Sequence, residues 1–394
     1  MANKVRVAGV GMIPFTKPGQ SEDWDVMGEK AIRLALEDAG IGYDKIQQAY
    51  AGYVYGDSTA GQSALYRVGV TGIPVVNVNN NCSTGSTALY LARQIVEAGG
   101  ADCVLAFGFE QMVPGALGSV FNDRKHVMEK HIAVQLAVQG FDKNAPGAAQ
   151  MFGGGGREYQ EKYGTPDDVF ALISVKARKH AANNPLAIFR DPLTVDEVLA
   201  SKKLYGPVTR YQACPPTCGA AAAVLVSDAF ARKHGLDAAV EIKAQAMTTD
   251  YPSSFEEKSM IKMIGYDMAK EAARQVYEAA GVGPSDVQVV ELHDCFTPNE
   301  LLTYEALGLC AEGGAEAFIR DEQNTYGGRV VTNPSGGLLS KGHPLGATGL
   351  AQCFELTHQV RGTAGARQAG QVTHALQHNL GLGGACVVTM YGKA

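Results

Sequence analysis

The sequence predicts a layered α/β protein made of two similar halves, with a further segment inserted into the first half. Two observations predict this fold class. Short apolar runs typical of buried strands, at residues 5–10, 75–78, 103–107 and 287–292, alternate with Ala- and Leu-rich stretches of helical periodicity. The sequence also repeats itself in two places. With 394 residues, 46% of them hydrophobic, the chain is long enough to form more than one core.

The first repeat joins residues 31–47 to residues 272–288. Each copy has the pattern of a helix, a glycine that ends it, a short turn and a strand. The matching residues are Ala31, Arg33, Glu37, Ala39, Gly40, Gly42 and Gln47 in the first copy and Ala272, Arg274, Glu278, Ala280, Gly281, Gly283 and Gln288 in the second.

The second repeat is shorter and lies further along both halves. Cys82, Gly85, Thr87 and Leu89 match His343, Gly346, Thr348 and Leu350. Four matches in a Gly- and Ala-rich sequence could arise by chance, but two repeats in the same order favour a duplication. We therefore expect an N-terminal half at residues 1–118 and 213–235, an inserted loop domain at 119–212, and a C-terminal half at 236–394. The expected insertion is poor in strand signals and contains four consecutive glycines at 153–156.

Composition and charge exclude several classes of protein. A formal net charge of -6 with scattered Lys and Arg residues gives no basic surface for nucleic acid. No apolar run approaches the ~18 residues of a membrane span, and residues 1–7 lack the pattern of a signal peptide. Eight cysteines are too few for a disulfide scaffold, and the last residues do not form a peroxisomal address. We expect a cytoplasmic protein.

We expect neither a bound metal ion nor a dinucleotide. Cys214 and Cys218 are closely spaced, but no second pair or nearby histidine completes a metal site. The glycines at 9–11 follow a strand but are not completed by a third glycine, and those at 153–156 follow no strand.

Cys82 is the first candidate for chemistry. It lies between a predicted buried strand and the helical pattern of residues 87–97, within the sequence Asn-Asn-Asn-Cys-Ser-Thr-Gly-Ser at 79–86. A helix start favours a thiolate through its dipole and its unpaired N–H groups. The alternative is an inert buried thiol, which we expect for Cys103, Cys310, Cys353 and Cys386.

His343 is the repeat equivalent of Cys82 and lies within Gly-His-Pro-Leu-Gly-Ala-Thr-Gly at 342–349. Pro344 suits the first turn of a helix. If the halves pack about a pseudo-twofold axis, the two helix starts converge and His343 could serve as the base for Cys82. A histidine in a purely structural role is the alternative.

A third cluster, Glu-Leu-His-Asp-Cys-Phe at 291–296, follows the predicted strand 287–290. The carboxyl end of a strand in an open α/β sheet is where ligands collect. His293 and Cys295 could polarise a carbonyl and move a proton, whereas we expect Asp294 to cap or orient a neighbour. A fourth cluster, His-Asn-Leu-Gly-Leu-Gly-Gly-Ala at 378–385, could supply backbone donors to a reacting oxygen or simply form turns.

These four clusters together resemble the thiolase family, specifically the sterol-carrier-protein type, and the likeness extends over essentially the whole chain. Residues 251–258 and 333–337 strengthen it. The resemblance implies a five-layered αβαβα fold, a homodimer or homotetramer, and coenzyme A as co-substrate with no permanently bound cofactor. It also implies cleavage of 3-ketoacyl-CoA, including 2-methyl-branched chains, as in fatty-acid β-oxidation.

The resemblance also implies a role for each catalytic residue. Cys82 resembles the acylated nucleophile, His343 its activator, His293 an oxyanion donor and Cys295 the acid/base cysteine. Many thiolases carry that second cysteine in a C-terminal Cys-x-Gly motif, whereas this chain has His378 and Asn379 there. An acyl-CoA carbon–carbon lyase and a non-catalytic CoA-binding scaffold are the alternatives. We expect no sterol-carrier lipid-binding domain to follow.

Overall fold

The computed structural model describes residues 3–115, 118–119 and 121–394. The remaining residues fall at the start of the expected N-terminal half and around its junction with the expected insertion, and they lie outside the described residues.

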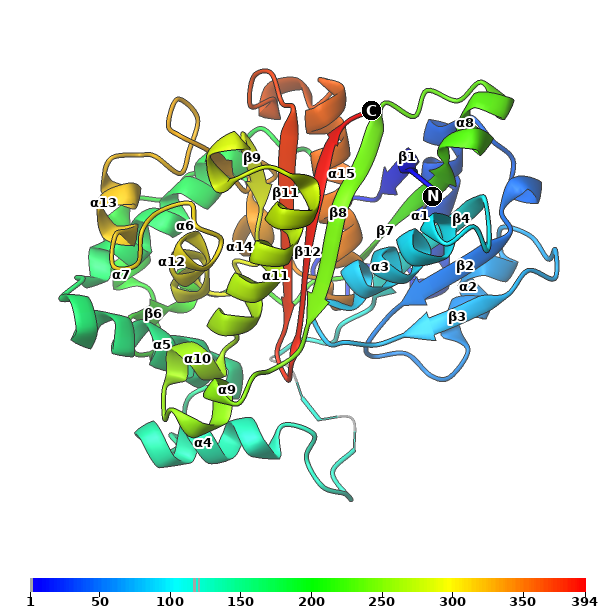
Figure 1. Ribbon diagram of the computed structural model, residues 1–394. Coiled ribbons are helices and arrows are strands. Elements are labelled where there is room, and N and C mark those ends of the chain that lie inside the picture. Colours follow the sequence, from blue (N-terminus) through cyan, green and yellow to red (C-terminus); the bar gives the residue numbers. More distant parts are fainter. Residues whose placement is uncertain (1–2, 116–117, 120) are drawn as a thin grey trace.

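In the part of the chain that the structure describes, one mixed sheet of ten strands has the order β10-β9-β11-β12-β8-β1-β7-β4-β2-β3 (Figure 1). Its first half contains β1 (Val5–Met12), β2 (Gln48–Gly52), β3 (Val75–Val78), β4 (Cys103–Glu110) and β7 (Gly219–Ser227). Its second half contains β8 (Val240–Thr248), β9 (Val289–Glu291), β10 (Val331–Thr332), β11 (His374–Gly381) and β12 (Ala385–Lys393). The halves meet at β1 and β8, which pair only at Arg6↔Glu241 and Val7↔Val240.

Both halves have the same topology, which confirms the expected duplication. The order β3-β2-β4-β7-β1 is repeated as β10-β9-β11-β12-β8. In each half the first three strands of this order are parallel and the next two pairings are antiparallel.

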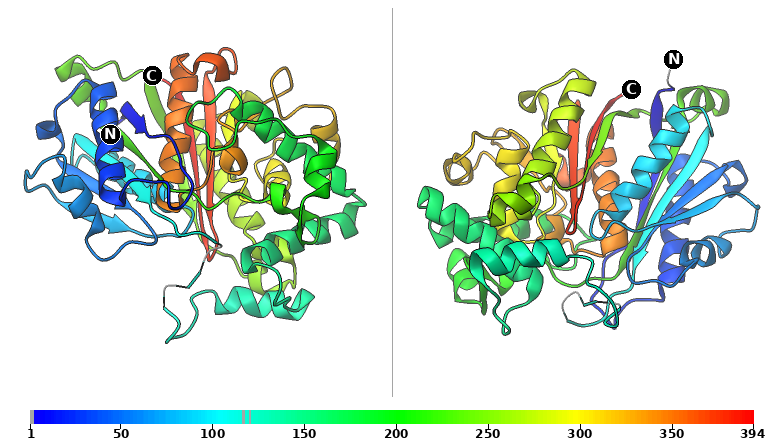
Figure 2. Two further views of the ribbon diagram at one scale, coloured as in Figure 1. Left: turned by 180° about the vertical axis from the view of Figure 1, so that it is seen from behind. Right: turned by 60° about the horizontal axis from the view of Figure 1, so that its bottom comes forward.

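The helices complete five layers. The outer face of the first half-sheet packs against α1 (Trp24–Ala39), beside α2 (Ala60–Tyr66), and that of the second packs against α11 (Tyr266–Ala280), beside α12 (Thr297–Ala306). Between the half-sheets lie α3 (Thr84–Glu97) and α15 (Leu345–Arg361), which contact each other and strands of both halves (Figure 2). The αβαβα layering is therefore as expected. The remaining helices of the two halves are α8 (Asp228–His234), α9 (Ser253–Glu256), α10 (Met260–Met263), α13 (Ala315–Arg320) and α14 (Gly337–Ser340).

The first sequence repeat corresponds to one structural unit used twice. Gly40 and Gly281 end α1 and α11 with the same left-handed backbone, φ 67° and ψ 28°. Gln47 and Gln288 lie just before β2 and β9, and each accepts hydrogen bonds from the backbone N–H groups that open the neighbouring strand of the sheet, β4 or β11, at 2.6–3.2 Å. The repeated glutamines thus fix equivalent strand starts in both halves.

Between β4 and β7 the chain forms a mainly helical insertion, as the lack of strand signals suggested. It contains α4 (Glu129–Gln139), α5 (Gly147–Tyr163), α6 (Asp167–Ala181), α7 (Val195–Ala200) and the hairpin β5 (Lys203–Tyr205) and β6 (Val208–Thr209). The glycines at 153–156 lie within α5, where a Cβ on any of them would come within 2.8 Å of a neighbour. Close packing therefore explains this glycine run. No helix within the described residues has the length and apolar character needed to cross a membrane.

Glycines also let the two central helices approach the first half-sheet. A Cβ on Gly108 of β4 would lie 2.0 Å from the carbonyl oxygen of Gly346 in α15, and one on Gly85 of α3 would lie 2.7 Å from the same oxygen. Because this neighbour is backbone, no side-chain rotation can relieve the clash.

We expect Gly108→Ala to lower the free energy of unfolding by about 1–3 kcal/mol, the usual cost of overpacking, and to impair the site that α3 and α15 build. Gly147→Ala is the matched control, because Gly147 begins α5 and a Cβ there meets nothing within 4 Å. Thermal denaturation of both variants measures the difference. Equal melting temperatures would show that the close approach is not needed.

Candidate active site

Cys82 lies in the tight turn between β3 and α3, as the sequence predicted. Asn81 has a left-handed backbone with φ 52°, which turns the chain sharply before the cysteine. Thr84 closes the turn, because its hydroxyl donates to the carbonyl of Asn81 at 2.6 Å and accepts from the N–H of Asn80 at 2.8 Å. The Cys82 side chain is thereby held at the helix start, only 6% exposed.

His343 occupies the equivalent position ahead of α15 in the second half. Its N–H donates to Thr217 Oγ1 at 3.0 Å, and its Nδ1 lies 2.7 Å from Thr348 Oγ1. The Thr348 hydroxyl donates its own proton to the carbonyl of Pro344, so its oxygen accepts from Nδ1–H. The Nε2 atom is buried and has no hydrogen-bond partner in the protein. His343 therefore presents a free lone pair at Nε2.

The repeat equivalent of Thr348 makes the same pattern of bonds. The Thr87 hydroxyl donates to the carbonyl of Ser83 at 3.0 Å and accepts from the Asn80 amide at 3.1 Å. In both halves a threonine therefore donates to the carbonyl four residues earlier and accepts from the polar side chain beside the turn.

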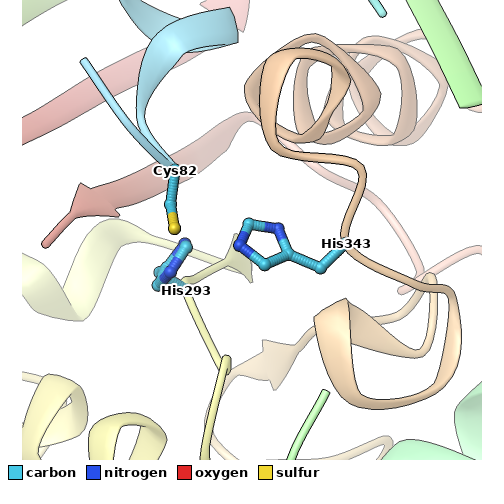
Figure 3. A group of neighbouring side chains, drawn as sticks. All are labelled: Cys82, His293 and His343. Carbon is cyan, nitrogen blue, oxygen red and sulfur yellow. The ribbon is translucent and has the colours of Figure 1, made fainter. Parts of the chain in front are cut away.

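The structure brings Cys82, His343 and His293 together from three separate segments (Figure 3). One ligand atom of each residue, the Cys82 sulfur and a ring nitrogen of each histidine, lies within 4.8 Å of the other two. The histidine rings are nearly perpendicular, at 80°, with centroids 5.1 Å apart. The predicted convergence of the two helix starts is thus observed.

His293 lies in the loop between β9 and α12 and is held from both sides. Its N–H donates to Nδ1 of His378 at 3.3 Å, and its own Nδ1 lies 3.0 Å from Nδ2 of Asn379. His378 and Asn379, whose roles the sequence left open, are therefore partners of His293. His378 lines a cavity of about 10 Å³, which is close to the smallest volume that holds one water molecule. Its Nε2 atom has no hydrogen-bond partner in the protein.

Burial keeps the trio uncharged when the site is empty. It raises the pKa of the Cys82 thiol to about 12, and it lowers the pKa of His343 to about 3 and that of His293 well below its usual value. The Cys82 thiol is therefore neutral at rest, although the helix start favours a thiolate. Desolvation outweighs the helix dipole here.

Cys295 lies near this trio, but its sulfur is not one of the three atoms that converge. It is 4% exposed, and burial together with the nearby Cys214 and Cys82 raises the pKa of its thiol far above the usual value. This thiol therefore holds its proton at neutral pH, as the Cys82 thiol does, but unlike Cys82 it does not belong to the group that contains His343.

Cys214 is a further thiol at the site that the sequence did not identify. Its N–H donates to the carbonyl of Cys295 at 2.9 Å, and Ala213 bridges to Phe296 in a short antiparallel contact. Cys218, its neighbour in the sequence, has a different environment, because its thiol donates to the carbonyl of Met112 at 3.4 Å. Only the folded chain shows that residues 214 and 295 are neighbours.

Asp294 caps a helix, although not the turn that follows it. Its carboxylate accepts from the N–H groups of Leu338 and Leu339 at the start of α14, at 2.7 and 3.3 Å. Glu291, at the end of β9, makes a second link to the segment before His343. Its buried carboxylate accepts from Ser335 and pairs with buried Lys341 at 3.2 Å. The His293 and His343 loops are thus joined directly.

Glu110 joins the first half to the start of α15. Its buried carboxylate accepts from the N–H groups of Val54, Tyr55 and Gly346 at 2.9–3.4 Å. Burial raises the pKa of Glu110 to about 7, although these three donors act in the opposite direction.

A raised carboxyl pKa means that the folded protein holds the proton more tightly than the unfolded chain. The stability that Glu110 contributes is therefore fully present below pH 4.5 and is lost as the pH rises through 7. We expect the free energy of unfolding of the natural protein, relative to Glu110→Gln, to fall by up to ~3 kcal/mol between these pH values. Chemical denaturation of both proteins at several pH values tests this. A constant difference would contradict the assignment.

Comparison with known proteins agrees with the geometry. Residues 5–200 match the thiolase N-terminal domain, and residues 253–391 match the thiolase C-terminal domain-like family. The chain therefore belongs to the thiolase family, whose members are acyltransferases.

Its relatives confirm the resemblance to the sterol-carrier-protein type. The chain is 57% identical to sterol carrier protein 2 of Oryctolagus cuniculus over 392 residues, which cover 98% of this chain and 72% of that protein. It is 48% identical to the non-specific lipid-transfer protein-like 2 of Caenorhabditis elegans, over 98% of this chain and 96% of that protein. Among solved structures, the Ltp2-ChsH2(DUF35) aldolase superimposes with a TM-score of 0.83 at 25% identity, covering 99% of this chain and 98% of that one.

Proposed function

We propose that the protein is a thiolase that cleaves 3-ketoacyl-CoA, including 2-methyl-branched chains, with coenzyme A as the acyl acceptor. The observation that carries the proposal is the neutral Cys82 thiol facing the free Nε2 lone pair of His343 in a buried site. A thiol beside an unprotonated base is the arrangement required for covalent acyl transfer.

In the first stage the Cys82 sulfur attacks the 3-keto carbon while its proton passes to Nε2 of His343. His293 stabilises the developing oxyanion. The bond between C2 and C3 then breaks, and the acetyl- or propionyl-CoA carbanion takes a proton from Cys295. The acyl group remains on Cys82 as a thioester.

In the second stage coenzyme A releases the acyl group. Its thiol gives its proton to the Cys295 thiolate while its sulfur attacks the Cys82 thioester. The bond to Cys82 then breaks, the Cys82 sulfur takes back the proton held by His343, and the product acyl-CoA departs. The burial of Cys295 supports this role, because a thiol with a strongly raised pKa is protonated again after each turnover. Every step is reversible, so the same groups support condensation.

A carbon–carbon lyase is the second candidate, and the structural likeness to an aldolase favours it. The two reactions differ in their need for coenzyme A. Cleavage of straight and 2-methyl-branched 3-ketoacyl-CoAs should require added coenzyme A, whereas a retro-aldol reaction on a 3-hydroxyacyl-CoA should not. Cleavage only of the hydroxyacyl substrate would establish the lyase. Binding of acyl-CoA without either reaction would favour the CoA-binding scaffold.

We further propose a homodimer formed through the edge strand β3. This strand has no partner on its outer side in the described residues, and Val76 is 40% exposed there. An uncovered apolar edge is a template for pairing with a second chain. Sedimentation of the natural protein and of Val76→Lys tests the interface, and a tetramer is the larger assembly that the same experiment would detect.

We also propose the cytoplasm as the compartment. The eight cysteines are all unpaired in the structure, which suits a reducing environment. Cell fractionation tests this proposal.

A further inference from the structure

A buried chain of hydrogen-bonding side chains ends on the ring of His293. It runs from Tyr391 through Gln377 and Ser86 to Asn379, and all four side chains belong to residues with no solvent exposure. In such a chain, each group that must act as an acceptor forces its neighbour to be the donor, so one fixed group determines the direction of the hydrogen bonds beside it.

The far end of the chain has only one possible orientation. Gln377 Nε2 lies 2.7 Å from the carbonyl oxygen of Gly349, which can only accept, so the amide nitrogen must face it. The same nitrogen lies 2.8 Å from Ser86 Oγ and 3.2 Å from Oε1 of Gln352, while the Tyr391 hydroxyl donates to the amide oxygen of Gln377. The Ser86 hydroxyl donates to Oδ1 of Asn379 at 2.8 Å, because this amide oxygen can only accept.

The orientation of the Asn379 amide, at the end of the chain beside His293, is also fixed. Asn379 Nδ2 donates to the carbonyl oxygen of Cys82 at 3.1 Å, and its second hydrogen is directed to Nδ1 of His293 at 3.0 Å. Turning the amide over would place Oδ1 against the Cys82 carbonyl and remove the acceptor for Ser86. The Nδ1 atom of His293 is therefore an acceptor, and in the neutral ring the proton lies on Nε2.

We propose that Asn379 is a positioning residue that holds His293 as a hydrogen-bond donor at Nε2, opposite in tautomer to His343. The catalytic meaning of this arrangement rests on the proposed thiolase function. One histidine then accepts the proton of Cys82, and the other donates to the oxygen of the substrate. Without Asn379 the Nδ1 atom of His293 would lose its donor and the tautomer of this ring would no longer be fixed, whereas Thr348 would still hold His343 in its own tautomer.

The same arrangement keeps the trio from acting as a metal site. By distance alone the three ligand atoms could bind an ion, because they lie within 4.8 Å of one another and a tetrahedral zinc site needs separations of about 3.5 Å. A metal ligand must offer a lone pair, and ligating histidines usually donate their other N–H to a carboxylate or carbonyl. His293 instead offers a proton at Nε2 and receives one at Nδ1.

Nitrogen-15 NMR of the histidine-labelled natural protein tests the tautomers directly. We expect His293 to be protonated at Nε2 and His343 at Nδ1, with signals assigned by the variants His293→Gln and His343→Gln. Protonation of His293 at Nδ1 would overturn the proposal. The result does not depend on enzymatic activity, so it separates this inference from the proposed function.

Cobalt(II) binding gives a second test through the metal. We expect the natural protein to show no thiolate-to-cobalt absorption. The variant Asn379→Asp should bind cobalt(II) at least tenfold more tightly, because its carboxylate would accept from Nδ1–H of His293 and so free the Nε2 lone pair of that ring for the metal. The double variant Asn379→Asp with Cys82→Ala should lose the absorption. Equal cobalt binding by the natural protein and Asn379→Asp would overturn the proposal. The NMR measurement remains decisive if the variant does not fold.

A kinetic test links the tautomer to turnover. Loss of one donor to an oxyanion usually lowers the rate ~10²- to 10³-fold, so we expect Asn379→Ala to reduce kcat by this amount with little change in KM. An unchanged kcat with a lower melting temperature would indicate a structural role only.

Discussion

Replacing Cys82 by alanine should abolish acyl capture and lower thiolysis by at least ~10⁴-fold, because Cys82 is the cysteine that converges with His343 and His293, whereas Cys295 and Cys214 are not part of that group. Incubation of the natural protein with a 3-ketoacyl-CoA or an acyl-CoA should add one acyl mass to the peptide that carries Cys82. The variant should remain folded, since the turn around residue 82 is held by Thr84 and Asn81 rather than by the thiol.

The control for this experiment is Cys103→Ala. Cys103 is fully buried in β4, and burial raises the pKa of its thiol to about 12, as for Cys82. This substitution should cost stability but leave acyl capture intact. An adduct on another cysteine, with the Cys82 peptide unmodified, would rule out the proposed mechanism.

Replacing Cys295 by serine should have the second largest effect. The variant should still take an acyl group onto Cys82 from an acyl-CoA, because that half-reaction needs no protonation of a carbanion. Complete thiolysis should fall ~10²- to 10⁴-fold, the usual contribution of a positioned proton donor. Single-turnover acylation and steady-state thiolysis, measured with the melting temperature on one sample, separate loss of the proton donor from loss of stability.

Cys214→Ser is the matched control, since burial also raises the pKa of its thiol and Cys214 contacts Cys295 through the backbone. It should lose much less turnover than Cys295→Ser. A larger loss would assign the proton to Cys214. Near-normal turnover in Cys295→Ser would instead direct attention to His378, which supports the His293 backbone.

The duplication and the segments of the candidate site could be predicted from the sequence because they leave local signals. Gln47 and Gln288 match because each fixes the start of a strand, and Cys82 and His343 match because each begins a central helix. The predicted strand at residues 75–78 has the bounds of β3. The helix at 153–156 could not be predicted, because glycines disfavour helices and only the packing of α5 explains them.

The supporting partners of the site could not be predicted in the same way. Asn379 and Ser86 interact across 293 residues, and no periodicity or motif joins them. Cys214 meets Cys295 only through a backbone contact between two loops. The sequence also indicates the helix start at Cys82, which favours a thiolate, but it does not show how completely the thiol is removed from water.

The limited pairing of β1 with β8 has a consequence for biosynthesis. When the ribosome has made the first half, the inner face of its sheet is only partly covered, because α15 is encoded more than 200 residues after β4. Apolar side chains of β4 and β7 therefore stay exposed to water until nearly the whole chain has emerged. Chains with apolar surface exposed in this way are prone to aggregate before they finish folding. The packing of α3 against α15, which brings Cys82 and His343 together, can therefore form only late in synthesis.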